Sequence, residues 1–491
     1  GILHSLSGTM AISETTVSNV LHMAADEINA DGGILGKQIE YIQEDGATDW
    51  PTFAEKTEKL LTQDCVAAIF GGWTSSSRKA VKPVVEEYNG LFFYPVQYEG
   101  LESSPNIYYT GATTNQQIIP AMDYLASQGV KTLFLAGSDY VFPRTANAII
   151  KLYAEELGIE IVGEEYVPLD RDDWTTQVAK IVEADPDYIF NTINGSSNVG
   201  FIKAYYDAGL TPEETPIISV SIAEEEAPAM GHEVTGNYAS WNYFQSLDTP
   251  NNPAFIEAWQ AYPGSSGVTS DPMEAAYISL YLYKALVEAA GSFDVDAINQ
   301  AALDNEITVD APEGVVTLNG ENHHISKPGH IGRINADNQF DIVWASDGFI
   351  EPDPYLEQYS WFPEDVRNAL RGPGLSGAPQ HRLFHEHARE QKGVNSNGCT
   401  DSAAAQRHRA GRLAALDSTR PHPDLRPDGG DQHGARRVHH GRRLHDIPRS
   451  ARHPRQQHLY PCRVARRLRR RRALGPSAGS RNSPVDVPSP A

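Results

Sequence analysis

Apolar residues follow two different spacings in residues 1–220, and the two alternate along the chain. One spacing is helical, and it is clearest on a face formed by Val17, Val20, Leu21, Ala24, Ala25 and Ile28. The other is a short apolar run, which predicts a buried strand; such runs occur at 39–42, 66–70, 91–94, 132–136 and 217–220. Strands that alternate with helices predict a mostly parallel sheet with helices on both faces. Because one sheet seldom takes so many units, we expect an α/β chain of two lobes.

The pattern changes after residue 250. Residues 252–262, 271–291 and 295–303 have helical spacing and follow one another without strands between them. Three later segments alternate with Asn, Asp and Gly turns and predict hairpin strands, at 314–318, 330–334 and 340–344. The last part of the chain therefore adds helices and antiparallel strands to an otherwise parallel arrangement.

Two successive strand ends in residues 71–100 bring unusual side chains to one edge of the predicted sheet. Trp73 follows a Gly-Gly corner, and hydroxyl residues at 74–77 open the next helix. Tyr94, Val96 and Gln97 lie at the end of the following strand. In an open α/β sheet, small ligands bind outside the carboxyl ends of the strands. This stretch is therefore expected to form half of a small-molecule site.

Aromatic residues also follow the strand at 132–136. Tyr140 and Phe142 occupy the corresponding corner there. Each ring could serve core packing alone, but together with Trp73, Tyr94 and Tyr98 they suit the apolar walls of a site for a small polar solute.

Acidic residues occur near two further predicted element ends. Glu225 is the middle of three glutamates after the strand at 217–220, and Asp271 and Glu274 open the long helix. They either complement the helix dipole or accept N–H groups from a ligand. Asn194-Gly195-Ser196 has the form of a glycosylation sequon, a pattern that often arises by chance.

Catalytic and cofactor chemistry is not expected. The chain has no Gly-x-Ser-x-Gly elbow and no glycine-rich phosphate loop, and Ser75 has no base near it in sequence. Cys65 precedes a strand and is interpreted as a small buried thiol. His323, His324 and His330 fall among the hairpin strands and are interpreted as surface residues rather than metal ligands.

Charge divides the chain at about residue 370. Residues 1–370 hold 55 acidic and 16 basic residues, a balance of −39, which suits concentrated salt and argues against a nucleic-acid partner. Residues 371–491 hold 9 acidic and 24 basic residues, and 23 of those bases are Arg. This basic tail is either an arm for an anionic surface or a disordered or out-of-frame segment, and its contrast with the body favours the second interpretation.

Several long motifs carry a family resemblance. LHSLSGTMAISE, the stretch 71–100 with ESSPNIYYTGA, GSDYVFPRTAN and the late HHISKPGHIGRI occur in that order. Over about residues 1–365 the chain resembles the urea-binding proteins of ABC-type urea transporters. These belong to the branched-chain amino acid and amide-binding group of type I periplasmic binding proteins.

The resemblance implies two Rossmann-like lobes that are joined by three crossovers and close on a ligand in the cleft between them. It also implies docking onto a membrane permease and an extracytoplasmic, lipoprotein-like location, with an export signal that this chain lacks. The expected division is residues 1–119 and 245–330 in lobe 1, 120–244 and 331–370 in lobe 2 or the hinge, and 371–491 in the tail.

Motif by motif, the resemblance assigns Trp73 and Ser75 to the first corner and Tyr94, Val96 and Gln97 to the second. Tyr140 and Phe142 face them from the other lobe, and Glu225, Asp271 or Glu274 could accept remaining N–H groups. The expected ligand is urea. The alternatives are a short-chain amide or branched-chain amino acid receptor and an amide-sensing regulator, whereas no enzyme, cofactor or metal is expected.

Overall fold

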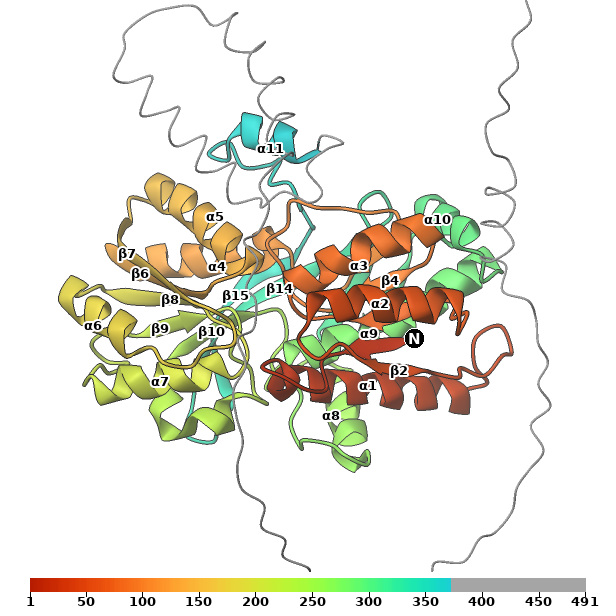
Figure 1. Ribbon diagram of the computed structural model, residues 1–491, viewed down its shortest axis with the longest axis horizontal. Helices are drawn as coiled ribbons and strands as arrows, with labels where there is room; N and C mark the ends of the chain where they lie inside the picture. The colour runs from red at the N-terminus through yellow and green to blue at the C-terminus, as the bar shows by residue number, and fades with distance from the viewer. Residues whose placement is uncertain (372–491) are drawn as a thin grey trace, which may run out of the picture. The chain divides into compact units, whose positions relative to one another are not determined.

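The computed structural model describes residues 1–371, and these form two α/β lobes (Figure 1). One sheet has the strand order β11-β12-β13-β5-β4-β3-β1-β2 and the other the order β15-β14-β10-β9-β8-β6-β7. The first sheet contains β1 (Ile2–His4), β2 (Gln43–Asp45), β3 (Ile69–Gly71), β4 (Phe92–Tyr94), β5 (Ile107–Tyr109), β11 (Thr308–Ala311), β12 (Gly314–Asn319) and β13 (His324–Ile325). The second contains β6 (Thr132–Ser138), β7 (Glu160–Val167), β8 (Tyr188–Thr192), β9 (Ile217–Ser219), β10 (Tyr238–Trp241), β14 (Lys327–Ile334) and β15 (Phe340–Ile350).

Lobe 1 is built on the parallel strands β2, β1, β3, β4 and β5. Phe70, Phe93 and Tyr108 stack in register across three of these strands, with ring centroids 4.9 Å apart at each step. The helices are α1 (Ala11–Ala30), α2 (Trp50–Thr62), α3 (Ser75–Tyr88), α8 (Asn252–Ala261), α9 (Asp271–Ala290) and α10 (Val295–Asp304). All six residues of the apolar face predicted at 17–28 are buried in α1, so that prediction is confirmed.

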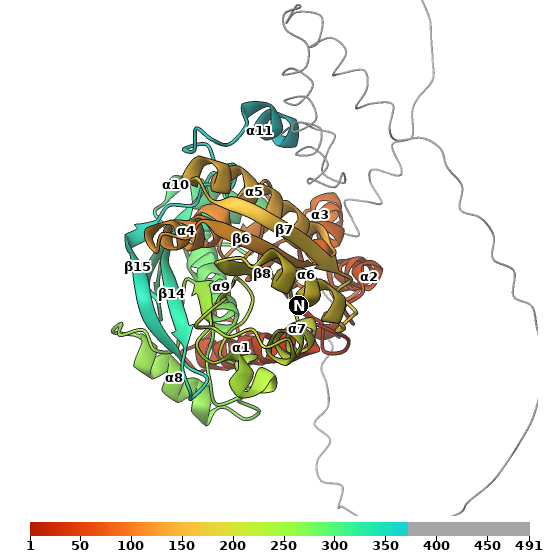
Figure 2. The ribbon, with the colours of Figure 1, turned by 90° about the vertical axis from the view of Figure 1, so that its left-hand side faces the viewer.

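Lobe 2 is built on the parallel strands β7, β6, β8, β9 and β10, and the antiparallel pair β14–β15 extends this sheet (Figure 2). The register places Phe134 beside Ile189, and these side chains join a core with Trp174, Phe201 and Trp241. Its helical segments are α4 (Thr114–Ser127), α5 (Val141–Leu157), α6 (Thr175–Ala184), α7 (Ser197–Asp207) and η1 (Ala227–Val234), and α11 (Glu364–Arg371) ends the described chain.

The chain passes between the two sheets three times. It leaves lobe 1 after β5 and enters lobe 2 through α4, returns after β10 toward α8, and leaves again between β13 and β14. Ser326 alone separates β13 from β14, so this last crossover is short. Two sheet lobes joined in this way match the type I periplasmic binding protein fold that the resemblance implied.

The first turn of α9 contacts all three crossovers. Asp271 Oδ2 accepts the backbone N–H groups of Asn242 and Tyr243, both at 3.0 Å, where the chain returns to lobe 1. Glu274 Oε2 lies 3.7 Å from the Nζ atom of Lys327, the first residue of β14. The carbonyl oxygen of Ala275 accepts the Thr110 hydroxyl at 2.9 Å, just after β5. One helical turn therefore holds each point at which the lobes are joined.

The strand expected at 39–42 is displaced, because β2 occupies 43–45 instead. The Asn29 side chain binds the Ile39 backbone, accepting its N–H at 2.6 Å and donating to its carbonyl oxygen at 2.9 Å. These contacts satisfy the backbone N–H and carbonyl groups of Ile39, which a sheet ladder would otherwise need. The apolar residues of this segment therefore do not form a buried strand.

The interpretations of Cys65 and of the three histidines are wrong. Cys65 is exposed, in a left-handed backbone conformation with φ of 56°. The three histidines are buried rather than at the surface, and the rings of His323 and His324 stack on Tyr108 and Tyr109 at centroid distances of 4.1 and 4.2 Å. Burial lowers the pKa of His323 to about 4 and that of His324 to about 3, so both rings are neutral near pH 7.

No helix among residues 1–371 is long and apolar enough to cross a membrane. The expectation for the basic tail concerns residues 371–491, and residues 372–491 of it lie outside the described residues.

Candidate functional site

The strand corners of the two lobes contact each other. The Trp73 indole N–H, after β3, donates to the side-chain oxygen of Asn194, after β8, at 3.2 Å. The Gln97 amide, after β4, donates to the carbonyl oxygen of Val220, after β9, at 2.9 Å. Tyr140 packs against the apolar cores of both lobes. Three corner residues predicted from the sequence therefore meet the opposite lobe.

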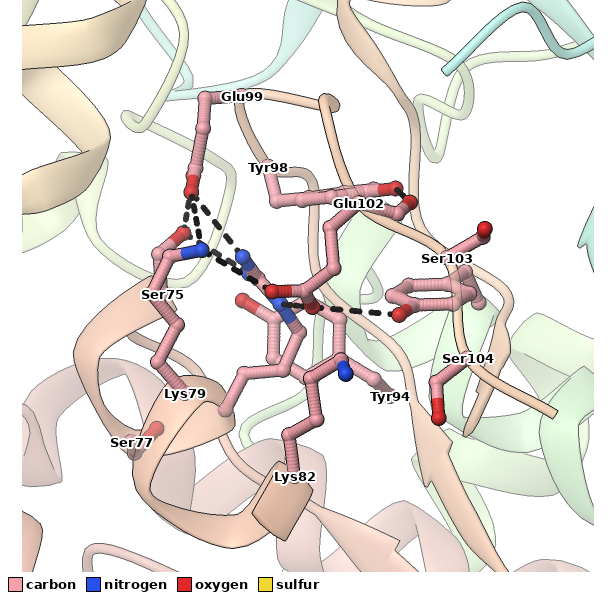
Figure 3. A network of polar contacts seen from close by, with 12 residues as sticks. Ser75, Ser77, Lys79, Lys82, Tyr94, Tyr98, Glu99, Glu102, Ser103 and Ser104 are labelled. Carbon is pink, nitrogen blue, oxygen red and sulfur yellow. Dashed lines mark hydrogen bonds and ion pairs between the residues drawn. The ribbon is translucent and has the colours of Figure 1, made fainter. Parts of the chain in front are cut away.

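Ser75 lies at the start of α3 and belongs to a network of buried polar groups (Figure 3). The helix begins here because the Thr74 hydroxyl accepts the Ser77 N–H at 3.1 Å, which caps its first turn. The Ser75 hydroxyl donates to Glu99 Oε2 and accepts a hydrogen bond from Arg78 Nη1 at 2.9 Å. Both hydrogen bonds use groups of lobe 1.

Arg78 is fully buried and satisfies two carboxylates. Its Nη2 lies 3.0 Å from Glu99 Oε1, and its Nε lies 2.8 Å from Glu102 Oε1. The guanidinium also lies over the rings of Tyr94 and Tyr98, at 5.0 and 4.4 Å from their centroids. Burial opposes the charge of Glu102, but Arg78 and Lys79 outweigh it and hold the pKa of that carboxyl well below its usual range.

Tyr94 contacts the first corner as well as Arg78. Its hydroxyl donates to the carbonyl oxygen of Trp73 and so holds the Gly-Gly-Trp turn against β4. Val96 is buried in the lobe 1 core, and its backbone lies against Gly111 so closely that a Cβ at that glycine would stand 2.1 Å from the Val96 carbonyl carbon. The second corner is thus held rigidly by its neighbours.

Tyr140 and Phe142 differ in position. Phe142 is 2% exposed and belongs to the lobe 2 core, and its ring centroid lies 6.4 Å from that of Tyr140. Burial raises the pKa of the Tyr140 hydroxyl well above its ordinary value, and the charges of Tyr94 and Glu99 across the lobes add to this. Tyr140 packs against the cores of both lobes, whereas Phe142 lies in the lobe 2 core alone.

The three glutamates after β9 are directed toward lobe 1. Glu226 accepts the hydroxyl of Ser13 from α1, and Glu224 accepts the backbone N–H of Gln245 at 2.8 Å. Neither oxygen of Glu225 has a well-formed hydrogen bond to another residue in the part of the chain that the structure describes. Burial raises the pKa of Glu225 to about 7; the Ser270 hydroxyl opposes this shift, and the charge of Asp271 adds to it.

The carboxylates of Asp271 and Glu274 interact with the crossovers described above. Burial raises the pKa of both carboxyl groups, and Lys327 opposes the shift in each case. Lys327 also lies 2.7 Å from Glu313 Oε1, so this single cation serves two buried carboxylates. In this cluster, Asp271 Oδ1, Glu274 Oε2 and Glu313 Oε2 have no hydrogen-bond partner among residues 1–371.

Sixteen buried side-chain nitrogen and oxygen atoms in residues 1–371 have no well-formed hydrogen-bond partner. Seven of them are oxygens of residues at the strand corners and crossovers, namely Gln97 Oε1, Asp271 Oδ1, Glu224 Oε2, both oxygens of Glu225, Glu226 Oε2 and Asn242 Oδ1. A buried acceptor without a donor is costly, so this region favours a partner that supplies several N–H groups.

The sequence analysis did not identify some residues of the site. Asn194 is 1% exposed and bonded to Trp73, so its sequon is not an accessible glycosylation site. Arg78 and Glu99 were also missed, although Arg78 is the only Arg in residues 71–100 and follows the hydroxyl cluster directly. An Arg inside a segment that is otherwise expected to be buried was the available signal.

A family model described as "Periplasmic binding protein domain" matches residues 1–361. The chain belongs to the periplasmic binding protein family. The chain is 24% identical over 275 residues to Leu/Ile/Val-binding protein homolog 6 of Brucella melitensis. The matched region covers 55% of this chain and 70% of that protein. Membership of the family implies a solute-binding protein of an ABC transporter that works outside the cytoplasm.

Solved structures of periplasmic binding proteins agree with this assignment. An ABC transporter solute binding protein from R. palustris in complex with 4-hydroxybenzoate has a TM-score of 0.66 at 23% identity, covering 73% of this chain and 99% of that chain. A branched-chain amino acid transporter substrate binding protein from Streptococcus pneumoniae, in complex with isoleucine, has a TM-score of 0.62 at 21% identity, covering 72% and 99%. At these identities the likeness shows the fold.

Proposed function

We propose that this periplasmic binding protein captures urea between its lobes and delivers it to the permease of an ABC transporter. The observation that carries the proposal is the set of buried oxygen acceptors at the strand corners and crossovers. Urea offers four N–H donors and one acceptor, and it is small enough for a site whose walls are aromatic corners. The sequence motifs at those corners support the same ligand.

Each residue then has a role. Gln97 Oε1, the free lone pair of Ser75 and the carboxylate of Glu225 accept urea N–H groups, and backbone N–H groups near Val96 donate to its oxygen. Trp73 and Tyr140 cover the planar faces of the ligand. Tyr94 and Phe142 support those two rings, while Asp271 and Glu274 hold the crossovers, and Asp271 Oδ1 remains available as an acceptor.

Two other ligand classes compete with urea. Short-chain amides have fewer N–H donors and would leave more of the acceptors unpaired. A branched-chain amino acid is the ligand suggested by the name of the Brucella relatives. An amide-sensing regulator would use the same site without a permease, and binding to a urea-transport permease in membranes would separate it from the proposed receptor.

Calorimetric titration of the protein with urea, acetamide, formamide and leucine tests the proposal. We expect a saturable heat with urea and a weaker one with the two amides. Tight leucine binding without any heat from urea would contradict it. Ammonia release during the urea titration would instead indicate an amidohydrolase, and we expect none.

The acidic body supports a second part of the proposal, that the protein works in concentrated salt. Residues 1–370 carry a balance of −39, and their self-repulsion is screened within a few Å at molar salt.

A further inference from the structure

The hydrogen-bonding capacity of Ser75 is nearly exhausted inside the protein. A hydroxyl has one donor and two lone pairs. Its O–H donates to Glu99 Oε2 (Figure 3). One lone pair accepts the bond from Arg78 Nη1. One lone pair remains. In this arrangement Ser75 can accept an N–H group from a ligand, but it has no hydrogen to donate to a ligand oxygen.

The charges around Ser75 are already balanced. Arg78 and Lys79 are the cations of this network, and Glu99 and Glu102 are its anions. Arg78 and Glu99 are both 0% exposed, so solvent screens their charges weakly. A ligand carboxylate placed at this corner would add a buried negative charge with no unpaired cation to meet it.

The opposite lobe offers no compensation. Glu224, Glu225 and Glu226, which follow β9, are acids and supply no cation. Lys327, the buried cation of the crossover region, is already paired with Glu313 and Glu274. A carboxylate ligand would therefore meet no unpaired cation among these groups.

We propose that Glu99 determines ligand specificity by holding the Ser75 hydroxyl as an acceptor, so that the site excludes ligands with a free carboxylate and admits uncharged, N–H-rich ones. The inference rests on the proposed function, in that the Ser75 corner faces the ligand. It goes further because it names the residue that separates amides and ureas from amino acids and other carboxylic acids.

Glu102 provides a matched control. Both glutamates bind Arg78 in the buried network, but only Glu99 bonds to Ser75. In Glu99→Gln, the amide nitrogen cannot accept the Ser75 O–H, and an amide oxygen turned toward Arg78 leaves that O–H free for a ligand oxygen. Glu102→Gln removes the same charge from Arg78 and leaves the bond between Ser75 and Glu99 in place.

The experiment compares acetate with acetamide, which have nearly the same shape, and isoleucine with urea, by calorimetric titration of the wild-type chain and both variants. The wild type is expected to bind the uncharged member of a pair and to reject the carboxylate. In E99Q the affinity ratio of carboxylate to uncharged ligand rises by about tenfold or more, the size expected when a charge-assisted hydrogen bond is gained. In E102Q the ratio rises less than in E99Q, because both variants lose the same charge beside Arg78 but only E99Q frees the Ser75 donor.

Two results would overturn the inference. One is wild-type binding of acetate or isoleucine as tight as that of the best uncharged ligand, and this result needs no variant to fold. The other is a folded E99Q whose ratio equals that of E102Q. Failure of the urea proposal is distinguishable, because a wild type that ignores urea yet binds acetamide and rejects acetate refutes urea and supports the role of Glu99.

Discussion

Trp73 joins the two lobes by a single side-chain hydrogen bond, so its contribution can be isolated. Trp73→Phe keeps a ring at the corner but removes the N–H that Asn194 accepts. The buried Asn194 oxygen then loses its donor when the lobes meet, and we expect urea affinity to fall about five- to tenfold. Calorimetry measures this change.

Trp259→Phe is the control for Trp73→Phe. Trp259 is a buried lobe 1 residue whose N–H reaches Ser266 of the same lobe, at 3.3 Å. Its loss should affect thermal stability and leave urea affinity almost unchanged. Equal affinity of Trp73→Phe and the wild type would show that the Trp73–Asn194 contact does not contribute to binding.

We expect Glu225 to make ligand binding depend on pH. Burial raises its pKa to about 7, so the carboxyl is protonated at pH 6 and ionised at pH 8. A raised pKa of an acid means that the unliganded protein loses stability as pH rises through about 7. The ionised group accepts N–H groups best, so the increase in Tm caused by urea should grow from pH 6 to pH 8.

Thermal melts with and without urea at each pH measure this dependence. Glu225→Gln cannot ionise and should flatten the contribution of this position. A urea-induced Tm shift in the wild type that is the same at pH 6 and pH 8 would argue against a role for Glu225 in binding.

Among the secondary-structure elements, the first turn of α9 depends on Lys327 for its stability. Lys327→Met would leave Glu274 and Glu313 buried without their cation, which typically costs about 3–5 kcal/mol. We expect a large drop in Tm, and melting by heat avoids urea, which is the proposed ligand. Replacing both glutamates by Gln in the same variant should restore much of the loss.

Lys203→Met serves as a control for Lys327→Met because Lys203 forms an exposed pair with Asp207. Exposed pairs contribute little, so its Tm should stay near that of the wild type. Similar Tm values for the two variants would mean that the buried network is not needed for stability.

The same elements show what a sequence can predict. The helix at 17–28 and the corner at Trp73 follow from local signals, namely periodicity and a capped helix start at Thr74. The pairing of Trp73 with Asn194 joins residues 121 positions apart, and nothing local specifies it. His323 and His324 were misplaced for the same reason, because the rings on which they stack come from β5, far away in sequence.

Side-chain contacts also decide whether a polar residue is free to bind a ligand. The sequence presents Ser75, Asp271 and Glu274 as candidate ligand contacts. In the structure the Ser75 O–H is bonded to Glu99, and the two carboxylates of α9 hold the crossovers. Hydrogen-bond capacity is a property of the assembled site, so composition and spacing could not predict it.

At the scale of the whole molecule, the charge balance predicts a response to salt. The acidic residues of the body repel one another in dilute buffer, and added salt screens this repulsion. We expect the Tm to rise as KCl increases from about 0.1 to 2 M, where the Debye length falls to a few Å. A sugar at matched osmolarity is the control, and a Tm that does not respond to KCl would contradict salt adaptation.

The anchoring of all three crossovers on one turn of α9 has a consequence for hydrogen exchange. The amide hydrogens of Asn242 and Tyr243 are held by Asp271 within the joint itself. We expect lobe opening to separate the corners at Trp73 and Gln97 and to leave these two bonds intact. The two amides should therefore exchange with deuterium slowly whether urea is present or absent, and so mark the part of the molecule that stays still while the lobes move.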